Sequence, residues 1–120
     1  MQNSKPEVVA ALGRALDPDR VHFVAPDDEA DLPCISYLEL NNVPISADDK
    51  EYLSAVDIAV DIWGEVGRTK PEEITSIARA VDRELCAIGG RRTHCTDIPP
   101  DGTHTLHKNM IYEFLFGEDE

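Results

Sequence analysis

The chain has 120 residues, which is enough for one domain and too few for two ordinary ones. Its 24 acidic residues outnumber its 11 basic ones, and the formal net charge is −13. Such a surface repels nucleic-acid phosphates and anionic lipid headgroups, so the charge argues against nucleic-acid and membrane binding and fits either plain solubility or contact with a basic partner.

Apolar runs in the chain are only a few residues long, whereas a membrane-spanning helix needs about 20. The first residues, MQNSKPEVV, lack the apolar core of a signal peptide. The cysteines Cys34, Cys86 and Cys95 are odd in number and widely spaced, which favours free thiols. We therefore expect a protein of the reducing cytosol, folded as a single domain over residues 1–120 with a frayed end at 1–3 and an acidic tail at 117–120.

Two segments have the sequence pattern of a helix start. Residues 4–7 (SKPE) and 69–72 (TKPE) each place a hydroxyl residue three positions before a glutamate, as in a capping box, with proline in the first turn. Apolar residues then recur at helical spacing, and Gly89-Gly90 is typical of a helix end. The expected buried stripes are Val8, Val9, Leu12 and Leu16 in the first helix, and Ile74, Ile77, Ala78, Val81 and Leu85 in the second.

Five segments have the composition of β-strands: 21–24, 34–40 (ending at Asn41-Asn42), 56–63, 91–97 and about 103–116. Proline and glycine in 98–102 predict the turn before the last strand. Apolar and polar residues alternate in 56–63, which is typical of a strand that is buried on one face only. We expect Val56, Ile58, Val60 and Ile62 on the buried side, Asp57 and Asp61 on the wet side, and Leu106, Met110, Tyr112 and Phe114 on one side of the last strand.

The element order is thus α-β-β-β-α-β-β. Short connections between strands favour antiparallel pairing, and each helix has a single apolar face that must lie on a sheet. We therefore predict an α/β (α+β) fold in two layers, with a mainly antiparallel mixed sheet and both helices packed on one face.

Candidate catalytic groups are sparse. Asp57 and Asp61 share a strand face at a separation of about 13 Å, beyond the ~5–9.5 Å used by acid–base carboxylate pairs, unless Glu113 closes the gap. His104 and His107 fall on opposite faces of a strand, which does not suit one zinc ion. Apart from a possible pairing of Cys95 with a histidine, no nucleophile motif is present. We expect no catalytic residue, no metal and no cofactor.

Trp63 ends the alternating segment on the Asp57 and Asp61 side. A single tryptophan there fits a half-buried lid on the core, and it equally fits an aromatic anchor at a protein interface, where tryptophan is enriched. Both interpretations stay open at this point.

Four motifs in fixed order have a familiar arrangement: ISYLELNN at 35–42, ADDKEYL at 47–53, VDIW at 60–63 and LHKNM at 106–110. Together they resemble the siphophage tail completion proteins, also called tail-to-head joining proteins, which are related in fold to tail terminators. The resemblance covers residues 35–116. One departure is Gly90, where that family usually has an aromatic residue after Ile88-Gly89.

The resemblance implies a structural subunit of a six-fold homo-oligomeric ring at the head-proximal end of a phage tail, assembled in the host cytoplasm. Its implied partners are further copies of itself, the tail-tube protein and the head-connector or stopper protein. We expect the loop Asp48-Asp49-Lys50-Glu51-Tyr52 to be the first contact, His107-Lys108 to be the second, and Trp63 to be a further interface candidate.

Two other functions compete with this one. A small acidic binding protein, such as a DNA mimic or an inhibitor of a basic nuclease, would explain the charge and would be a monomer or dimer. A metal-dependent enzyme using Asp57, Asp61, Glu113 or the histidines would reveal itself by its metal content.

Overall fold

The structure is a computed structural model, and it describes residues 6–26, 31–46, 52–99 and 105–117. These residues form helix α1 (Pro6–Ala15), a 3₁₀ turn (Pro18–Arg20), strands β1 (Val21–Phe23), β2 (Cys34–Ser46) and β3 (Tyr52–Glu65), helix α2 (Pro71–Ala87), and strands β4 (Arg91–Ile98) and β5 (Thr105–Gly117). The predicted order α-β-β-β-α-β-β is confirmed.

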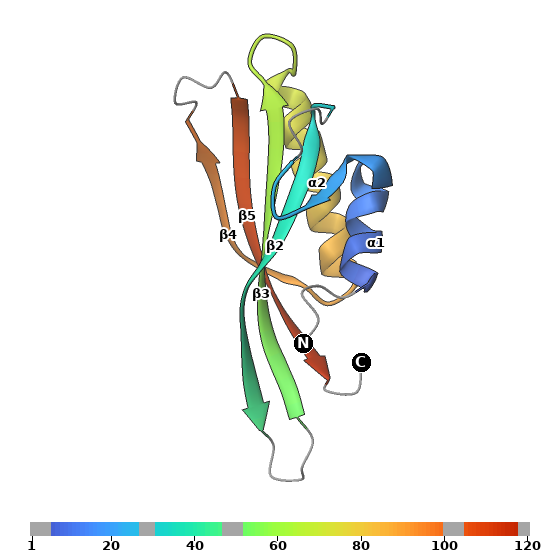
Figure 1. The fold of residues 1–120 in the computed structure, drawn as a ribbon, viewed down its shortest axis with the longest axis vertical. Helices are drawn as coiled ribbons and strands as arrows, with labels where there is room; N and C mark the ends of the chain where they lie inside the picture. The colour runs from blue at the N-terminus through green and yellow to red at the C-terminus, as the bar shows by residue number, and fades with distance from the viewer. Residues whose placement is uncertain (1–5, 27–30, 47–51, 100–104, 118–120) are drawn as a thin grey trace.

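The five strands make one mixed sheet in the order β1-β2-β3-β5-β4. The pairs β2–β3, β3–β5 and β4–β5 are antiparallel, and only the short β1 runs parallel to its neighbour β2. Both α-helices lie side by side on the same face of this sheet (Figure 1). The predicted two-layer α+β architecture is therefore confirmed. None of the helices in the described ranges is long and apolar enough to cross a membrane.

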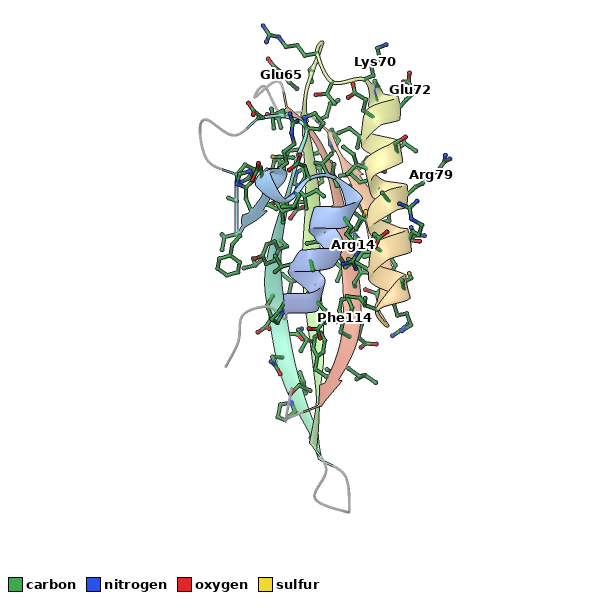
Figure 2. All side chains as sticks on the ribbon, turned by 90° about the vertical axis from the view of Figure 1, so that its right-hand side faces the viewer. Arg14, Glu65, Lys70, Glu72, Arg79 and Phe114 are labelled. Carbon is green, nitrogen blue, oxygen red and sulfur yellow. The ribbon has the colours of Figure 1, made fainter. Side chains whose placement is uncertain are left out.

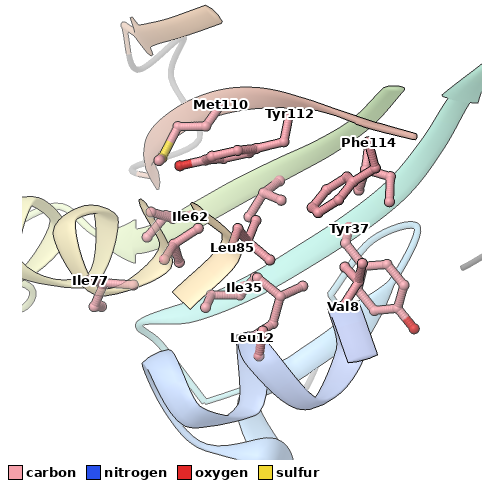
Figure 3. Close-up of a cluster of buried hydrophobic side chains, with 14 of the residues drawn as sticks. Val8, Leu12, Ile35, Tyr37, Ile62, Ile77, Leu85, Met110, Tyr112 and Phe114 are labelled. Carbon is pink, nitrogen blue, oxygen red and sulfur yellow. The ribbon is translucent and has the colours of Figure 1, made fainter. Parts of the chain in front are cut away.

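The core lies between the helices and the inner face of the sheet (Figure 3). Alternation along β3 sends every second residue toward the helices, as the sequence pattern predicts. Helix α1 is also tied to α2 on the surface, where the Arg14 guanidinium donates to Glu84 at 2.8 Å. This bond is the main cause that lowers the pKa of Glu84. The buried set from the two predicted helix stripes and from β3 and β5 includes Val8, Leu12, Ile74, Ile77, Val81, Leu85, Val56, Ile58, Val60, Ile62, Met110, Tyr112 and Phe114.

The start of α2 differs from the prediction by one residue. Lys70 is the N-cap, Pro71 is the first helical residue, and the carboxylate of Glu73 accepts from the Lys70 amide at 3.0 Å. The Thr69 hydroxyl instead accepts from the Glu65 amide at 2.9 Å and closes the turn that joins β3 to the helix. The cap predicted at Ser4 lies outside the described residues.

The end of α2 is a Schellman turn, as the two glycines indicate. The Gly90 amide donates to the Leu85 carbonyl at 2.9 Å, and the Gly89 amide donates to the Cys86 carbonyl at 3.1 Å. Gly89 has a φ of 98°, which favours glycine. At Gly90 a Cβ atom would lie 2.6 Å from Cζ of Phe114. The ring of Phe114 thus leaves no room for a side chain at position 90, where the family resemblance leads us to expect an aromatic residue.

Strand β2 is longer than the sequence indicates. It was expected to end at Asn41-Asn42, but it passes through them to Ser46, with a register shift between Glu39 and Asn41. A bulge of this kind lets a strand absorb one extra residue and continue. The hairpin of β2 and β3 consequently reaches beyond the end of the helical layer (Figure 2).

Candidate interaction surface

In the part of the chain that the structure describes, both α-helices lie on one face of the sheet and no helix covers the other face (Figures 1 and 2). We call this second side the open face. The strand register arranges its side chains in rows that run across β2, β3, β5 and β4. From one end to the other the rows are Val43–Ala55–Leu115, Asn41–Asp57–Glu113–Arg91, Leu38–Ala59–Ile111–His94, Ser36–Asp61–Asn109–Thr96 and Cys34–Trp63–His107–Ile98.

A hydrogen-bonded cluster occupies the last two rows. The indole of Trp63 stacks on the imidazole of His107, with ring centroids 3.8 Å apart and an interplanar angle of 15°. Trp63 Nε1 donates to the hydroxyl of Ser36 at 2.8 Å. His107 Nε2 lies 2.6 Å from Asp61 Oδ1, which also accepts from Asn109 Nδ2 at 2.9 Å. The cluster therefore fixes the aromatic pair rigidly on the open face.

The second row is charged and contains an unbalanced carboxylate. Asp57 pairs directly with Glu113 across β3 and β5, which places like charges opposite each other. Arg91 neutralises Glu113 at 2.6 Å. Asp57 is partly buried, and within the described ranges no cation lies at ion-pair distance from it. A carboxylate in this setting is favourably placed to meet a cation from another molecule.

Apolar side chains flank this charged row on both sides. Leu115 is 60% exposed and Val43 is 53% exposed in the row nearest the hairpin end, and Leu38 and Ile111 are partly buried in the row beyond it. Exposed apolar side chains around a partly buried, unpaired carboxylate mark this part of the open face as a candidate protein interface.

The residues expected to form the first contact are not placed by the structure. Asp48, Asp49, Lys50 and Glu51 lie outside the described residues. Tyr52 begins β3 and pairs with Ser46 at the tip of the hairpin, and its side chain is not described. The described residues on either side of this loop, Ser46 and Tyr52, are paired at the ends of β2 and β3.

The other three candidates separate into two places. Trp63 and His107 come together in the stacked pair described above. Lys108 points to the opposite side of β5, where its ammonium pairs with Asp97 at 2.7 Å. It lies beside a pocket of about 280 Å³ between the first turn of α2 and the β4–β5 pair, whose lining includes Pro71, Ile74, Thr75, Ile98 and Leu106.

Two of the candidate catalytic carboxylates, Asp61 and Glu113, are engaged in structural contacts. Glu113 faces Asp57, as the sequence allowed, but it is held by Arg91, and Asp61 is held by His107 and Asn109. Within the described ranges no group of three or more histidine, cysteine, aspartate or glutamate side chains could hold a metal ion. Cys34 is buried, and this burial raises the pKa of its thiol to about 11 despite the nearby Arg20. Such a thiol stays protonated and unreactive at neutral pH.

The sequence did not identify the apolar rows or the partners in the cluster. The position of Leu115 on the open face could have been predicted, because the unbroken apolar run Phe114-Leu115-Phe116 places an apolar residue on each face of one strand. Val43 was missed because β2 was expected to end before it. The hydrogen bonds of Ser36 and Asn109 depend on strand register, which short-range patterns do not specify.

Both the sequence and the fold have known relatives. Residues 3–100 match the model of the family described as Tail completion protein gp17. A chain from the structure titled "Virion of native gene transfer agent (GTA) particle" has a similar fold, with a TM-score of 0.56 and 10% sequence identity over 95% of this chain and 87% of that chain. At this identity the likeness supports the fold alone. No curated protein matches the sequence.

The family model spans most of the chain, and the four ordered motifs in the central and C-terminal regions had indicated the same family independently. The chain therefore belongs to the tail completion protein family and is a structural protein of a phage tail.

Proposed function

We propose that the protein is a subunit of a homo-oligomeric ring that completes the head-proximal end of a phage tail and joins the tail tube to the head connector. The observation that carries this proposal is the family match over residues 3–100. A protein with this task works through its surfaces, without catalysis. Substitution of a reactive side chain away from the open face, as in Cys95→Ser, should therefore leave joining unchanged.

The dimensions of the fold support a ring around DNA. The chain measures 55 × 24 × 24 Å. Six bodies 24 Å wide, placed side by side on a circle, have their centres at least 24 Å from the axis, since a regular hexagon has a radius equal to its side. Subtracting half of one body's width from this distance on each side of the axis leaves a central channel at least 24 Å across, which admits a DNA duplex. The charge of −13 per copy would let DNA pass without adhering.

The acidic loop 48–52 is our first choice for the contact with a neighbouring subunit or with the tail tube, because it joins β2 to β3, and these two strands extend beyond the helical layer (Figure 2). The second choice is the start of β5, at His107 and Lys108. The partly buried ammonium of Lys108 lies there beside an apolar pocket, so this end of the strand suits a partner that offers an apolar side chain with a carboxylate nearby.

Charge reversal in the loop tests the proposal. The variant Asp48→Lys/Asp49→Lys replaces attraction by repulsion at every copy in the ring, and like charges at an interface cost several kcal/mol. We expect lysates complemented with this variant to contain DNA-filled heads and free tails, as seen by electron microscopy, while the isolated protein stays folded. The matched control is Asp19→Lys/Asp31→Lys, which changes the net charge equally at two exposed positions outside the loop. Infectious, joined particles from the loop variant would remove the loop from the interface.

A further inference from the structure

Most arginines and lysines of the described ranges are bonded within the chain, and the exceptions are informative. Among the described arginines and lysines, Arg20 donates a hydrogen bond to the Pro33 carbonyl, and most of the others form ion pairs. Only the side chains of Lys70 and Arg79, within these described residues, have neither a hydrogen bond nor a carboxylate within 4.0 Å. On the open face, Asp57 is the partly buried carboxylate that lacks a cation within the described ranges.

Arg79 lies on the solvent-exposed side of α2 and extends away from α1 (Figure 2). Its neighbours at helical spacing are Thr75, Ser76, Asp82 and Arg83. Small residues beside the arginine let another surface approach the helix closely, while the long arginine side chain reaches outward from it. Arg79 projects from the helical layer (Figure 2). Asp57 lies between the buried Val56 and Ile58 on β3 and therefore faces the opposite side of the sheet, so the two cannot meet within one chain.

We propose that the open face of one copy receives the exposed side of α2 of the next copy, with Arg79 of that copy forming an ion pair with Asp57. This inference rests on the proposed ring function and identifies its subunit contact. The apolar rows that contain Leu38, Val43, Ile111 and Leu115 would flank the ion pair and exclude water from it.

Two features favour a second copy over an unrelated basic partner. The contact is heterologous, since two different surfaces of the same chain meet, and such a contact repeats from copy to copy and gives a ring where the rotation closes. It also covers the uncovered face of the sheet with a helix, which gives the sheet a helical layer on both faces.

The test is an exchange of charges, measured by sedimentation velocity and light scattering at physiological ionic strength. Asp57→Arg and Arg79→Asp should each weaken association roughly 100-fold, because each places like charges against each other. The double variant Asp57→Arg/Arg79→Asp should restore association to within about tenfold of the wild type, since the pair is re-formed in reverse. Circular dichroism melts establish that all variants are folded.

Two matched variants control for net charge. Asp19→Arg changes the charge as Asp57→Arg does, at an exposed site on the 3₁₀ turn, and Lys70→Asp changes it as Arg79→Asp does, at the N-cap of α2. Both should associate like the wild type.

The proposal is overturned if the wild type stays monomeric at every concentration, if the single variants associate normally, or if the double variant is no better than either single one. Normal association of the single variants would leave the ring function intact and move the contact elsewhere. A wild-type protein that is always monomeric would instead count against both.

Discussion

The contact between Gly90 and Phe114 makes a sharp prediction about packing at the end of α2. The substitution Gly90→Ala adds one Cβ atom, which would lie 2.6 Å from Cζ and 2.8 Å from Cε2 of the Phe114 ring and 2.9 Å from the Leu85 carbonyl oxygen. Phe114 is 2% exposed, so its ring has little room to move. Shortening the ring with Phe114→Leu removes the two colliding atoms and leaves the carbonyl contact in place.

The expected cost follows from these contacts. Overpacking of a core by one carbon costs about 1–3 kcal/mol, and the loss of backbone freedom in the unfolded chain returns about 0.4–1 kcal/mol. Gly90→Ala should therefore lower the free energy of unfolding by about 1–2 kcal/mol, or the melting temperature by roughly 3–12 °C for a chain of this size. In the Phe114→Leu background the same substitution should cost at least ~1 kcal/mol less.

The assay is urea unfolding of the wild type, both single variants and the double variant, monitored by circular dichroism. Gly67→Ala is the control, because Gly67 has a φ of 90° and an added Cβ there would have no atom within 4 Å. Its cost of about 1–2 kcal/mol comes from the backbone alone and should be the same with either residue at position 114. If the effects of Gly90→Ala and Phe114→Leu add to within about 0.5 kcal/mol, the ring does not fill the space beside Gly90, and the reasoning fails.

Four further predictions concern the core, the surface, the buried thiol and Tyr112. Ile58→Asp and Ile77→Asp should each unfold the protein. Each puts a carboxylate into the core in place of a side chain whose burial contributes about 1.5–3 kcal/mol. If both variants melt like the wild type by circular dichroism, α2 does not pack on β3 as described. Duplex DNA should show no salt-sensitive micromolar mobility shift at physiological salt, because the charge of −13 offers no basic stripe for counterion release. Burial raises the pKa of the Cys34 thiol from 9.0 to about 11, so between these pH values the folded protein keeps a proton that the unfolded chain loses. The contribution of Cys34 to stability should therefore be full below pH 9 and fall as the pH rises toward 11. Urea unfolding midpoints measured across this range should decline less steeply for Cys34→Ala than for the wild type. Burial and the hydrogen bond to Asp82 also raise the pKa of Tyr112, so Tyr112→Phe should reduce the alkaline loss further.

The sequence predicted the fold well where periodicity carries the information. The alternation of Val56, Ile58, Val60 and Ile62 and the stripe of α2 both identify residues that the structure buries. These patterns follow from the geometry of single elements, and a burial pattern with a period of 2 or 3.6 needs no knowledge of distant residues.

The sequence failed where the outcome depends on contacts between elements. Strand β2 continues past Asn41-Asn42 because a bulge and pairing with β3 override the turn preference of asparagine. Thr69 was expected to cap α2, but it bonds to the Glu65 amide instead, since the turn after β3 places its hydroxyl there. In the candidate surface, Trp63 and His107 were both expected, but their stacking depends on the β3–β5 register.

The stacked pair of Trp63 and His107 has a practical consequence. Trp63 is the single tryptophan of the chain, so the indole fluorescence of the native protein arises from one known position. A surface that covers the indole excludes water from it and shifts that emission to shorter wavelength. The protein thus carries an intrinsic, label-free optical reporter on its open face, and a partner that covers this face would change the emission of Trp63.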